Sequence, residues 1–434
     1  MTRCYFRNPR LVLCVAAALA GAACDLTLPN PNSPPAQDVL STPDGLVALA
    51  VGMQAQYASG VGDFLIPPSL TTDEWGTTTR SLIAYQSLLT GNNFDASYAV
   101  VLAPWADAYR TIKSANNLLL HAPQVALGPG LEAGIVSLAK LFKAMALGTL
   151  VLQYQEVPID VSGTAPVPRP RAEVVDTVLA LLESARADYT GVTAADLSGF
   201  NSRVLGTGFN VLNTIDAMRA RYYLVAGQYQ QAIDAADSVL ARPLALSVFT
   251  YTPPAFNPIW DLAFSTAYVR VLKSFKDQAE AGDGRVTYWT DTTTANQTTG
   301  NPDSTLMPLK KFSAQTDAYP VYLPDEMKLI KAEAFTQLGT LDSAAFYVNA
   351  VRTQTSSPVD EPVANLPALD PGTQLATAPQ LLAQIAYERR YELFEQGLRW
   401  EDTRRLGTAI TTTPTLPFLP IPLQECDANP AAGC

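Results

Sequence analysis

The feature that most constrains the fold is a densely charged segment near the end of the chain, AYERRYELFEQGLRWEDTRRLG at residues 386–407. Between Glu388 and Arg405, 10 of 18 residues are charged, five acidic and five basic, although only 16% of the whole chain is charged. On one continuous helix these charges would pair at i,i+3 or i,i+4 spacing. The expected pairs are Glu395–Arg399, Glu401–Arg405, Arg389–Glu392 and Asp402–Arg405.

Large apolar side chains stand between these charges, among them Tyr391, Phe394 and Trp400. A solvated, salt-bridged surface helix is the ordinary interpretation of many charges on one helix. Aromatic rings among the charges favour a structural ion network that lies partly inside the protein. The expected members of this network are Glu388, Arg389, Glu392, Glu395, Arg399, Asp402, Arg404 and Arg405.

Helical periodicity covers much of the remaining chain, so the sequence predicts a mainly α-helical fold. The predicted helices are 42–57, 99–121, 131–155, 171–189, a pair within 210–240, a pair within 326–354, and 379–405. The stretch 135–154 is very apolar but carries Lys140 and Lys143 near its middle. We therefore expect it to be a buried amphipathic helix and not a membrane span.

Two predicted helix pairs have the spacing of a tetratricopeptide repeat. The matching positions are Ala220, Tyr223, Gly227, Tyr229, Ala232 and Ala236 in the first pair, and Ala332, Phe335, Gly339, Leu341 and Ala344 in the second. Small residues let two antiparallel helices approach, and Gly227 permits the turn between them. The stretch 140–154, with Ala144 and Gly148, is a candidate degenerate member.

The N-terminus has the pattern of a secretory signal peptide over residues 1–23. Three arginines precede an apolar run at 11–23 that is too short to span a bilayer. Small residues before Cys24 indicate a lipoprotein processing site, so Cys24 is the expected lipidation site. Cleavage after Ala23 without lipidation is the alternative, because Gly21 stands where leucine is usual. Residues 24–37 are expected to be an extended tether, and 38–434 one domain.

Charge and cysteine content narrow the possible partners. Without residues 1–23 the chain has 26 basic and 40 acidic residues, a net charge of −14, which disfavours binding to nucleic acid.

Cys426 and Cys434 are expected to form a disulfide that closes the C-terminal loop in an oxidising compartment. A metal site is a poor alternative, because these two cysteines and the single histidine, His121, do not complete ordinary zinc coordination. We expect no metal and no other cofactor.

The sequence also speaks against catalysis. Any Ser–His–Asp or Cys–His arrangement would depend on His121, which lies near a predicted helix end. The acidic pairs 73–74 and 325–326 are neighbours in sequence, and neighbours do not by themselves make two opposed carboxylates flanking a sugar bond. The GTG at 206–208 lacks the third glycine of a dinucleotide loop. We expect a binding protein and not an enzyme.

Two long segments without helical periodicity, 59–97 and 249–320, are rich in Thr, Asn and Gly. Binding residues often lie in such loops. Aromatic rings can stack on the C–H faces of sugars, while Asn and Arg side chains bond their hydroxyls. The expected ligand contacts are Trp75, Arg80, Tyr85, Asn93, Tyr288 and Trp289, and the core is the alternative place for the two tryptophans. Trp105 and Trp400 lie in predicted helices and are expected in the core.

The charged segment closely resembles the C-terminal signature of the SusD/RagB family. That pattern reads Glu-Arg, Glu, an aromatic, Glu-Gly, Arg-Trp, and Asp before Arg-Arg. It is filled here by Glu388, Arg389, Glu392, Phe394, Glu395, Gly397, Arg399, Trp400, Asp402, Arg404 and Arg405, with Gln396 inserted before Gly397 and Glu401 where an aromatic is common. The closing PFLPIPLQECDANP at 417–430 resembles the family's final Pro-Ile-Pro segment.

The resemblance implies a SusD-like fold, with tetratricopeptide-like helix pairs as the scaffold and long irregular loop insertions. It implies a lipid-anchored protein on the outer face of a Gram-negative outer membrane. Such a protein captures a nutrient, here expected to be an oligosaccharide, and delivers it to a SusC-like TonB-dependent transporter. The alternatives are a peptide or glycopeptide ligand, as in the RagB branch, and a repeat-protein adaptor without a small ligand.

Overall fold

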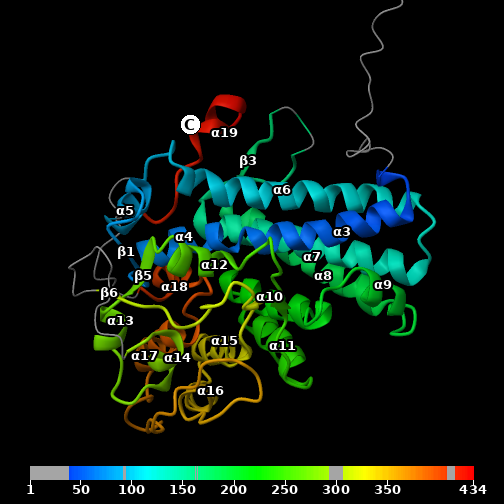
Figure 1. Ribbon diagram of the computed structural model, residues 1–434. Coiled ribbons are helices and arrows are strands. Elements are labelled where there is room, and N and C mark those ends of the chain that lie inside the picture. The colour runs from blue at the N-terminus through cyan, green and yellow to red at the C-terminus, as the bar shows by residue number, and fades with distance from the viewer. Residues whose placement is uncertain (1–38, 91–93, 162, 164, 293–305, 408–415) are drawn as a thin grey trace, which may run out of the picture.

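Helices that follow one another in sequence also pack against one another in space. The computed structural model describes residues 39–90, 94–161, 163, 165–292, 306–407 and 416–434. The principal helices are α3 (Pro43–Ser59), α4 (Val61–Thr71), α6 (Ala99–His121), α7 (Pro129–Gln153), α8 (Arg171–Thr190), α10 (Val211–Val225), α11 (Tyr229–Leu240), α15 (Pro324–Gln337), α16 (Leu341–Arg352), α17 (Ala378–Glu392) and α18 (Arg399–Leu406). Helix α6 packs on α7, α7 on α8, α8 on α10, α10 on α11, α11 on α15 and α15 on α16 (Figure 1). The predicted mainly helical fold is confirmed.

Local sequence signals explain where these helices begin and turn. The Thr42 side chain accepts a hydrogen bond from the Gly45 amide at the start of α3, and Thr377 and Gln380 form a capping box at the start of α17. Gly227 and Gly339 have φ of 71° and 79° in the turns of the two helix pairs, a conformation that glycine adopts without steric cost. The predicted helix pairs are confirmed, and their tetratricopeptide character stays a prediction.

Helix α7 is long and apolar enough to cross a membrane by length and composition alone. In this structure it is instead a central core helix, packed between α6 and α8. Close approach to its neighbours requires glycine: a Cβ on Gly148 would lie 2.0 Å from the hydroxyl oxygen of Tyr222 on α10. The expectation of a buried helix is confirmed.

Strands are short and join segments that are distant in sequence. Within the described residues they form three small antiparallel groups. The first has the order β1 (Trp75–Thr77), β5 (Val269–Leu272), β6 (Leu306–Met307); the second pairs β2 (Glu156–Pro158) with β3 (Pro168–Pro170), and the third β4 (Val248–Phe249) with β7 (Tyr319–Pro320). Trp75 lies opposite Val271 in the first group, so the N-terminal and central segments meet there.

Short helical elements complete the chain. They are α5 (Ile83–Thr90), α9 (Ser198–Arg203), α12 (Pro258–Trp260), α13 (Ser274–Asp277), α14 (Gly284–Trp289) and α19 (Leu423–Ala428), with a 3₁₀ turn η1 (Ala122–Gln124) and a π turn η2 (Asp261–Ser265).

Two sequence predictions about secondary structure are wrong. The segments 59–97 and 249–320 are not irregular throughout: the first contains α4 and α5, and the second contains the short helices α12, α13 and α14 and the strands β5 and β6. Helix α4 includes Pro67 and Pro68, and Pro68 has no N–H to bond the carbonyl of Phe64 four residues earlier. The side-chain amide of Gln153 donates to that carbonyl at 2.9 Å. The contact with Gln153 on α7 thus supplies the hydrogen-bond donor that Pro68 lacks.

The second error concerns the predicted helix 379–405. It is two helices, because α17 ends at Glu392 and α18 begins at Arg399. Between them Glu395 and Gly397 have φ of 64° and 68°. A right-handed helix cannot continue through two left-handed residues.

Candidate functional site

The charged segment lies in the interior of the protein. Glu388, Glu392 and Glu395 are completely buried, and Arg389, Arg399 and Asp402 nearly so. Arg404 and Arg405 at the end of α18 are half-buried. This burial excludes the solvated surface helix. Six of the eight predicted network members lie in ion pairs, whereas Glu395 and Arg399 lie in none among the described residues.

The break between α17 and α18 changes which charges pair. Asp402 and Arg405 form the expected pair at 2.8 Å, and Arg405 lies 3.8 Å from Glu401. The predicted pairs Arg389–Glu392 and Glu395–Arg399 are not among the ion pairs of the described residues. Arg389 donates instead to Asp402 at 2.8 Å. The pair Glu395–Arg399 is lost because Glu395 lies in the break. Arg389 and Glu392 both lie in α17, but Arg389 pairs with Asp402 of α18 instead.

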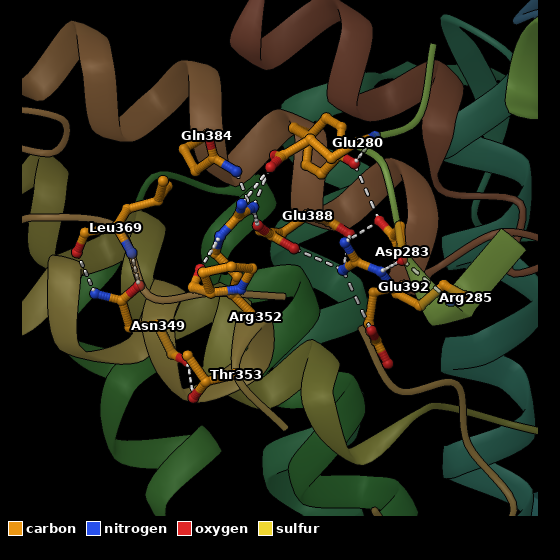
Figure 2. Close-up of polar contacts among 12 residues, drawn as sticks. Glu280, Asp283, Arg285, Asn349, Arg352, Thr353, Leu369, Gln384, Glu388 and Glu392 are labelled. Atoms are coloured by element: carbon orange, nitrogen blue, oxygen red, sulfur yellow. Dashed lines mark hydrogen bonds and ion pairs between the residues drawn. The ribbon is translucent and has the colours of Figure 1, made fainter. Parts of the chain in front are cut away.

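One half of the network surrounds Arg285, which the sequence analysis did not single out. Figure 2 shows Arg285 between Asp283, Glu388 and Glu392. Its guanidinium donates to both oxygens of Asp283 at 2.9 and 2.7 Å, and lies 2.6 Å from Glu388. Arg352 reaches the other oxygen of Glu388 at 3.2 Å and also pairs with Glu280. This half joins α14, α16 and α17.

The other half surrounds Asp402 and ties α18 to distant helices. Asp402 accepts from Arg389 and Arg405, and Arg405 also pairs with Glu333 on α15. Burial works against ionisation of Asp402, but Arg389 and Arg405 hold its pKa below the ordinary value. Arg171 on α8 donates to Glu401 at 2.7 Å. The network thus fastens α17 and α18 to α8, α14, α15 and α16.

Several buried carboxyls lack a full counter-charge. Burial raises the pKa of Glu395 well above its ordinary value, and burial raises the pKa of Glu74 to about 8 despite the opposing effect of Arg399. The pKa of Glu392 is also raised well above its ordinary value, first by burial and then by Asp325. These groups hold protons more tightly in the folded chain than in an unfolded one.

The predicted ligand contacts Trp75 and Trp289 are wrong. Both indoles are in the core, 1% and 0% exposed. Trp75 donates to Oε1 of Glu395 at 2.6 Å, and Trp289 donates to the carbonyl of Tyr391 at 2.9 Å. An indole needs a partner for its N–H when buried, and in both cases the charged segment supplies it.

The remaining predicted contacts do not converge on one place. Arg80 is exposed beside β1, and Tyr85 on α5 is largely buried with its ring 5.8 Å from that of Tyr268. Tyr288 on α14 donates to Asp360 at 3.0 Å, and α14 lies well apart from α5 (Figure 1). Asn93 lies outside the described residues, as do Cys24, the signal peptide and the tether.

A groove along α6 combines aromatic and hydrogen-bonding groups, and the sequence did not lead us to predict it. Its volume is about 580 Å³, within the usual range for small-ligand sites. We call it the α6 groove; it is lined by Trp105, Tyr109, Lys113, Asn116, Asn117, Pro158, Val161, Pro166 and Glu425. The sequence did contain a signal, because positions 105, 109, 113 and 117 recur every four residues and share one helix face.

Secondary contacts hold the walls of the α6 groove. The Tyr109 hydroxyl donates to the carbonyl of Pro158 at 2.7 Å, and Lys143 donates to Asn116 at 2.8 Å. Asn429, just after α19, donates to the carbonyl of Pro166 at 2.7 Å. Across the described parts of the chain, the Lys113 and Asn117 side chains have no hydrogen-bond partner, so they are available to a ligand.

The predicted disulfide Cys426–Cys434 is present. It lies at the C-terminal end, where α19 carries Glu425 into the lining of the α6 groove. The disulfide closes a loop of eight residues' separation and so restrains the segment that forms this wall.

Comparison with known proteins identifies the fold. A model of the SusD family matches residues 263–416. A SusD superfamily protein from Bacteroides thetaiotaomicron is 20% identical, with a TM-score of 0.71 over 90% of this chain and 99% of the other. One from Bacteroides fragilis is 17% identical, with a TM-score of 0.71 over 92% and 100%. No curated protein matches the chain.

A third solved structure, from Bacteroides vulgatus, is described as a SusD-like carbohydrate binding protein. It is 15% identical, with a TM-score of 0.70 over 90% of this chain and 97% of the other. The family match covers the whole charged segment, and the structural likeness covers nine-tenths of the chain. The chain has the SusD-like fold, and its residues 263–416 match the SusD family.

Proposed function

We propose that this protein binds an oligosaccharide in the α6 groove and delivers it to a SusC-like TonB-dependent transporter. The observation that carries the binding site is the composition of the groove wall. Part of the Tyr109 ring lines the groove, and Lys113, Asn117 and Glu425 provide hydrogen-bond donors and acceptors around it. Sugars need both a stacking surface and hydrogen bonds to their hydroxyls, and pockets of this kind fix orientation through a few polar groups.

The geometry favours binding without catalysis. Glu425 is the only carboxylate among the groove's lining residues, whereas glycoside hydrolysis uses a pair of carboxylates across the scissile bond. Because each exposed ring and amide contributes only a few kcal/mol, we expect weak to moderate affinity for each sugar chain. Such affinity allows release to a partner.

Calorimetric titration of the mature chain with a panel of oligosaccharides tests this proposal. Tyr109→Ala and Asn117→Ala should each weaken binding about five- to thirtyfold, since each removes a contact worth on the order of 1–2 kcal/mol. Arg80→Ala, at the exposed position beside β1, is the matched control and should leave the affinity unchanged. If Arg80→Ala weakens binding and the other two variants do not, the site lies instead in the loops around β1 and α5.

A peptide panel measured in the same way separates the alternatives. Binding of peptides and not of sugars would favour the RagB-like function. Binding of neither, with capture of other folded proteins, would favour an adaptor built on the helix pairs.

We further propose that Cys24 is lipidated and that residues 24–37 tether the protein to the outer membrane, on the cell surface. The basic and apolar N-terminal segment followed by Cys24 supports this. Radiolabelled palmitate should be incorporated by the wild-type chain and not by Cys24→Ser. Membrane extracts should yield the protein together with a large barrel, and its recovery alone would count against the transporter partner.

A further inference from the structure

Three buried carboxylates from separate parts of the chain meet beside the ion network. They are Asp325 in the first turn of α15, Glu361 in the segment between α16 and α17, and Glu392 at the end of α17. One oxygen from each lies within 4.8 Å of the others. Their exposed fractions are 1%, 5% and 0%. Three negative charges so close together and out of water require compensation.

The surrounding cations supply only part of it. Lys328 pairs with Asp325, but Arg285 is bonded to Asp283 and Glu388, and Arg352 to Glu280 and Glu388. The nearest cation to Glu392 is Arg285, 3.6 Å from Oε2 and beyond hydrogen-bonding distance. In Figure 2 a single dashed line, from Arg285, reaches the Glu392 carboxylate.

Glu392 supplies the independent indication of a ligand. It is completely buried, and neither of its carboxylate oxygens accepts a hydrogen bond within the described structure. Buried polar groups without partners are rare and require an explanation. Oε2 of Glu361 and Oδ2 of Asp325 also have no hydrogen-bond partner in that part of the chain.

The orientation of Glu361 fits a built site. Ser357 and Gln354 both donate to its Oε1, at 2.6 and 3.3 Å, which leaves Oε2 for another partner. Outer partners of this kind fix a metal-ligating carboxylate in place. Burial, followed by Asp325, raises the pKa of Glu361 to about 7, as expected where negative charge is not balanced.

We propose that Asp325, Glu361 and Glu392 bind one divalent cation, and that the cation is calcium. All the side-chain ligands are carboxylate oxygens, which suits a hard cation and not zinc. Calcium accepts several carboxylates, each through one or two oxygens, whereas magnesium keeps most of its water, which a site this buried does not accommodate. The cation would join α15, α17 and the segment between α16 and α17.

The test is thermal unfolding of the mature chain after chelator treatment, with calcium added back. Because a ligand that binds only the folded state raises its stability, saturating calcium should raise Tm by about 3 °C or more. Magnesium at equal concentration should raise it less. Calorimetric titration should show one calcium per chain.

Substitutions locate the ion. Asp325→Asn and Glu392→Gln should each abolish the calcium response. Glu392→Gln should also leave the calcium-free protein folded, since it removes a buried charge that accepts no hydrogen bond within the described structure. Asp342→Asn, an exposed carboxylate on α16, should respond as the wild type does. Absence of any Tm change or heat in the wild type overturns the proposal, and the carboxyls then share protons instead. An unchanged response in both variants overturns it equally.

Discussion

The indole of Trp75 donates a hydrogen bond of 2.6 Å to Oε1 of Glu395, across 320 residues of sequence. Both side chains are buried. Glu395 lies in the left-handed break between α17 and α18, and Trp75 lies in β1. This bond therefore fixes the irregular part of the charged segment against the central strands.

Trp75→Phe should destabilise the protein by about 1–3 kcal/mol beyond the effect of the smaller ring, because Glu395 loses the one side-chain hydrogen-bond donor that it has among the described residues. Urea unfolding measures this. Trp260→Phe is the matched control, since the half-buried Trp260 makes no side-chain hydrogen bond in the described structure. Its cost should be under about 1 kcal/mol. Equal costs for the two variants would show that the Trp75–Glu395 bond contributes nothing.

Arg285 is the central cation of the network, and its loss should be severe. Arg285→Gln leaves Asp283 and Glu388 buried without their guanidinium, and removal of one partner of a buried ion pair costs about 3–5 kcal/mol. Arg203→Gln breaks an exposed pair with Asp44 and should cost less than about 1 kcal/mol. Chemical denaturation of both variants checks the difference, and similar small losses would mean that the network is not a stabilising unit.

Much of the helical scaffold could be predicted because its signals are local. The predicted 99–121 has the same bounds as α6, and Thr42 and Gly227 mark a cap and a turn by their own chemistry. Helix α4 could not be predicted, because its prolines depend on a hydrogen bond from Gln153, 89 residues away from Phe64.

The candidate sites were harder to predict because their members meet only in the folded chain. The composition of the charged segment indicated buried ion pairs, but nothing local connects Glu388 to Arg285 or Glu395 to Trp75. Aromatic residues in loop-like segments suggested ligand contacts, yet the Trp289 side chain is completely buried in the core. The α6 groove draws on α6, the β2–β3 segment and α19, a combination that no single stretch of sequence reveals.

Close packing of α7 against α10 predicts opposite effects of the same substitution at two helical glycines. Gly148→Ala places a methyl group against Tyr222 and should cost about 1–3 kcal/mol. Gly52→Ala on α3 meets nothing within 4 Å and should stabilise by about 0.5–1 kcal/mol through helix propensity. Thermal unfolding of the two variants measures the contrast. A stable Gly148→Ala would show that α7 and α10 can separate without loss.

The pH dependence of stability should carry a signature of Glu74. Its pKa is raised from 4.5 to about 8 by burial, so between these values the folded chain holds a proton that the unfolded chain has released. The free energy of unfolding therefore falls as pH rises from about 5 to 8, by up to about 1.4 kcal/mol per pH unit for this group. Below about pH 4.5 both states are protonated and the effect vanishes.

Glu74→Gln removes this proton uptake and leaves the other buried carboxyls in place. In urea unfolding at pH 5, 6, 7 and 8, the free energy of unfolding should fall less steeply with pH for Glu74→Gln than for the wild type. The difference between the two slopes should correspond to at most one proton. Glu173→Gln, at an exposed position on α8, should follow the wild type. The depressed pKa of Asp402 acts only below its ordinary range near 4, outside this window. Parallel curves for wild type and Glu74→Gln would mean that Glu74 is ionised in the folded protein, with Arg399 as its effective counter-charge.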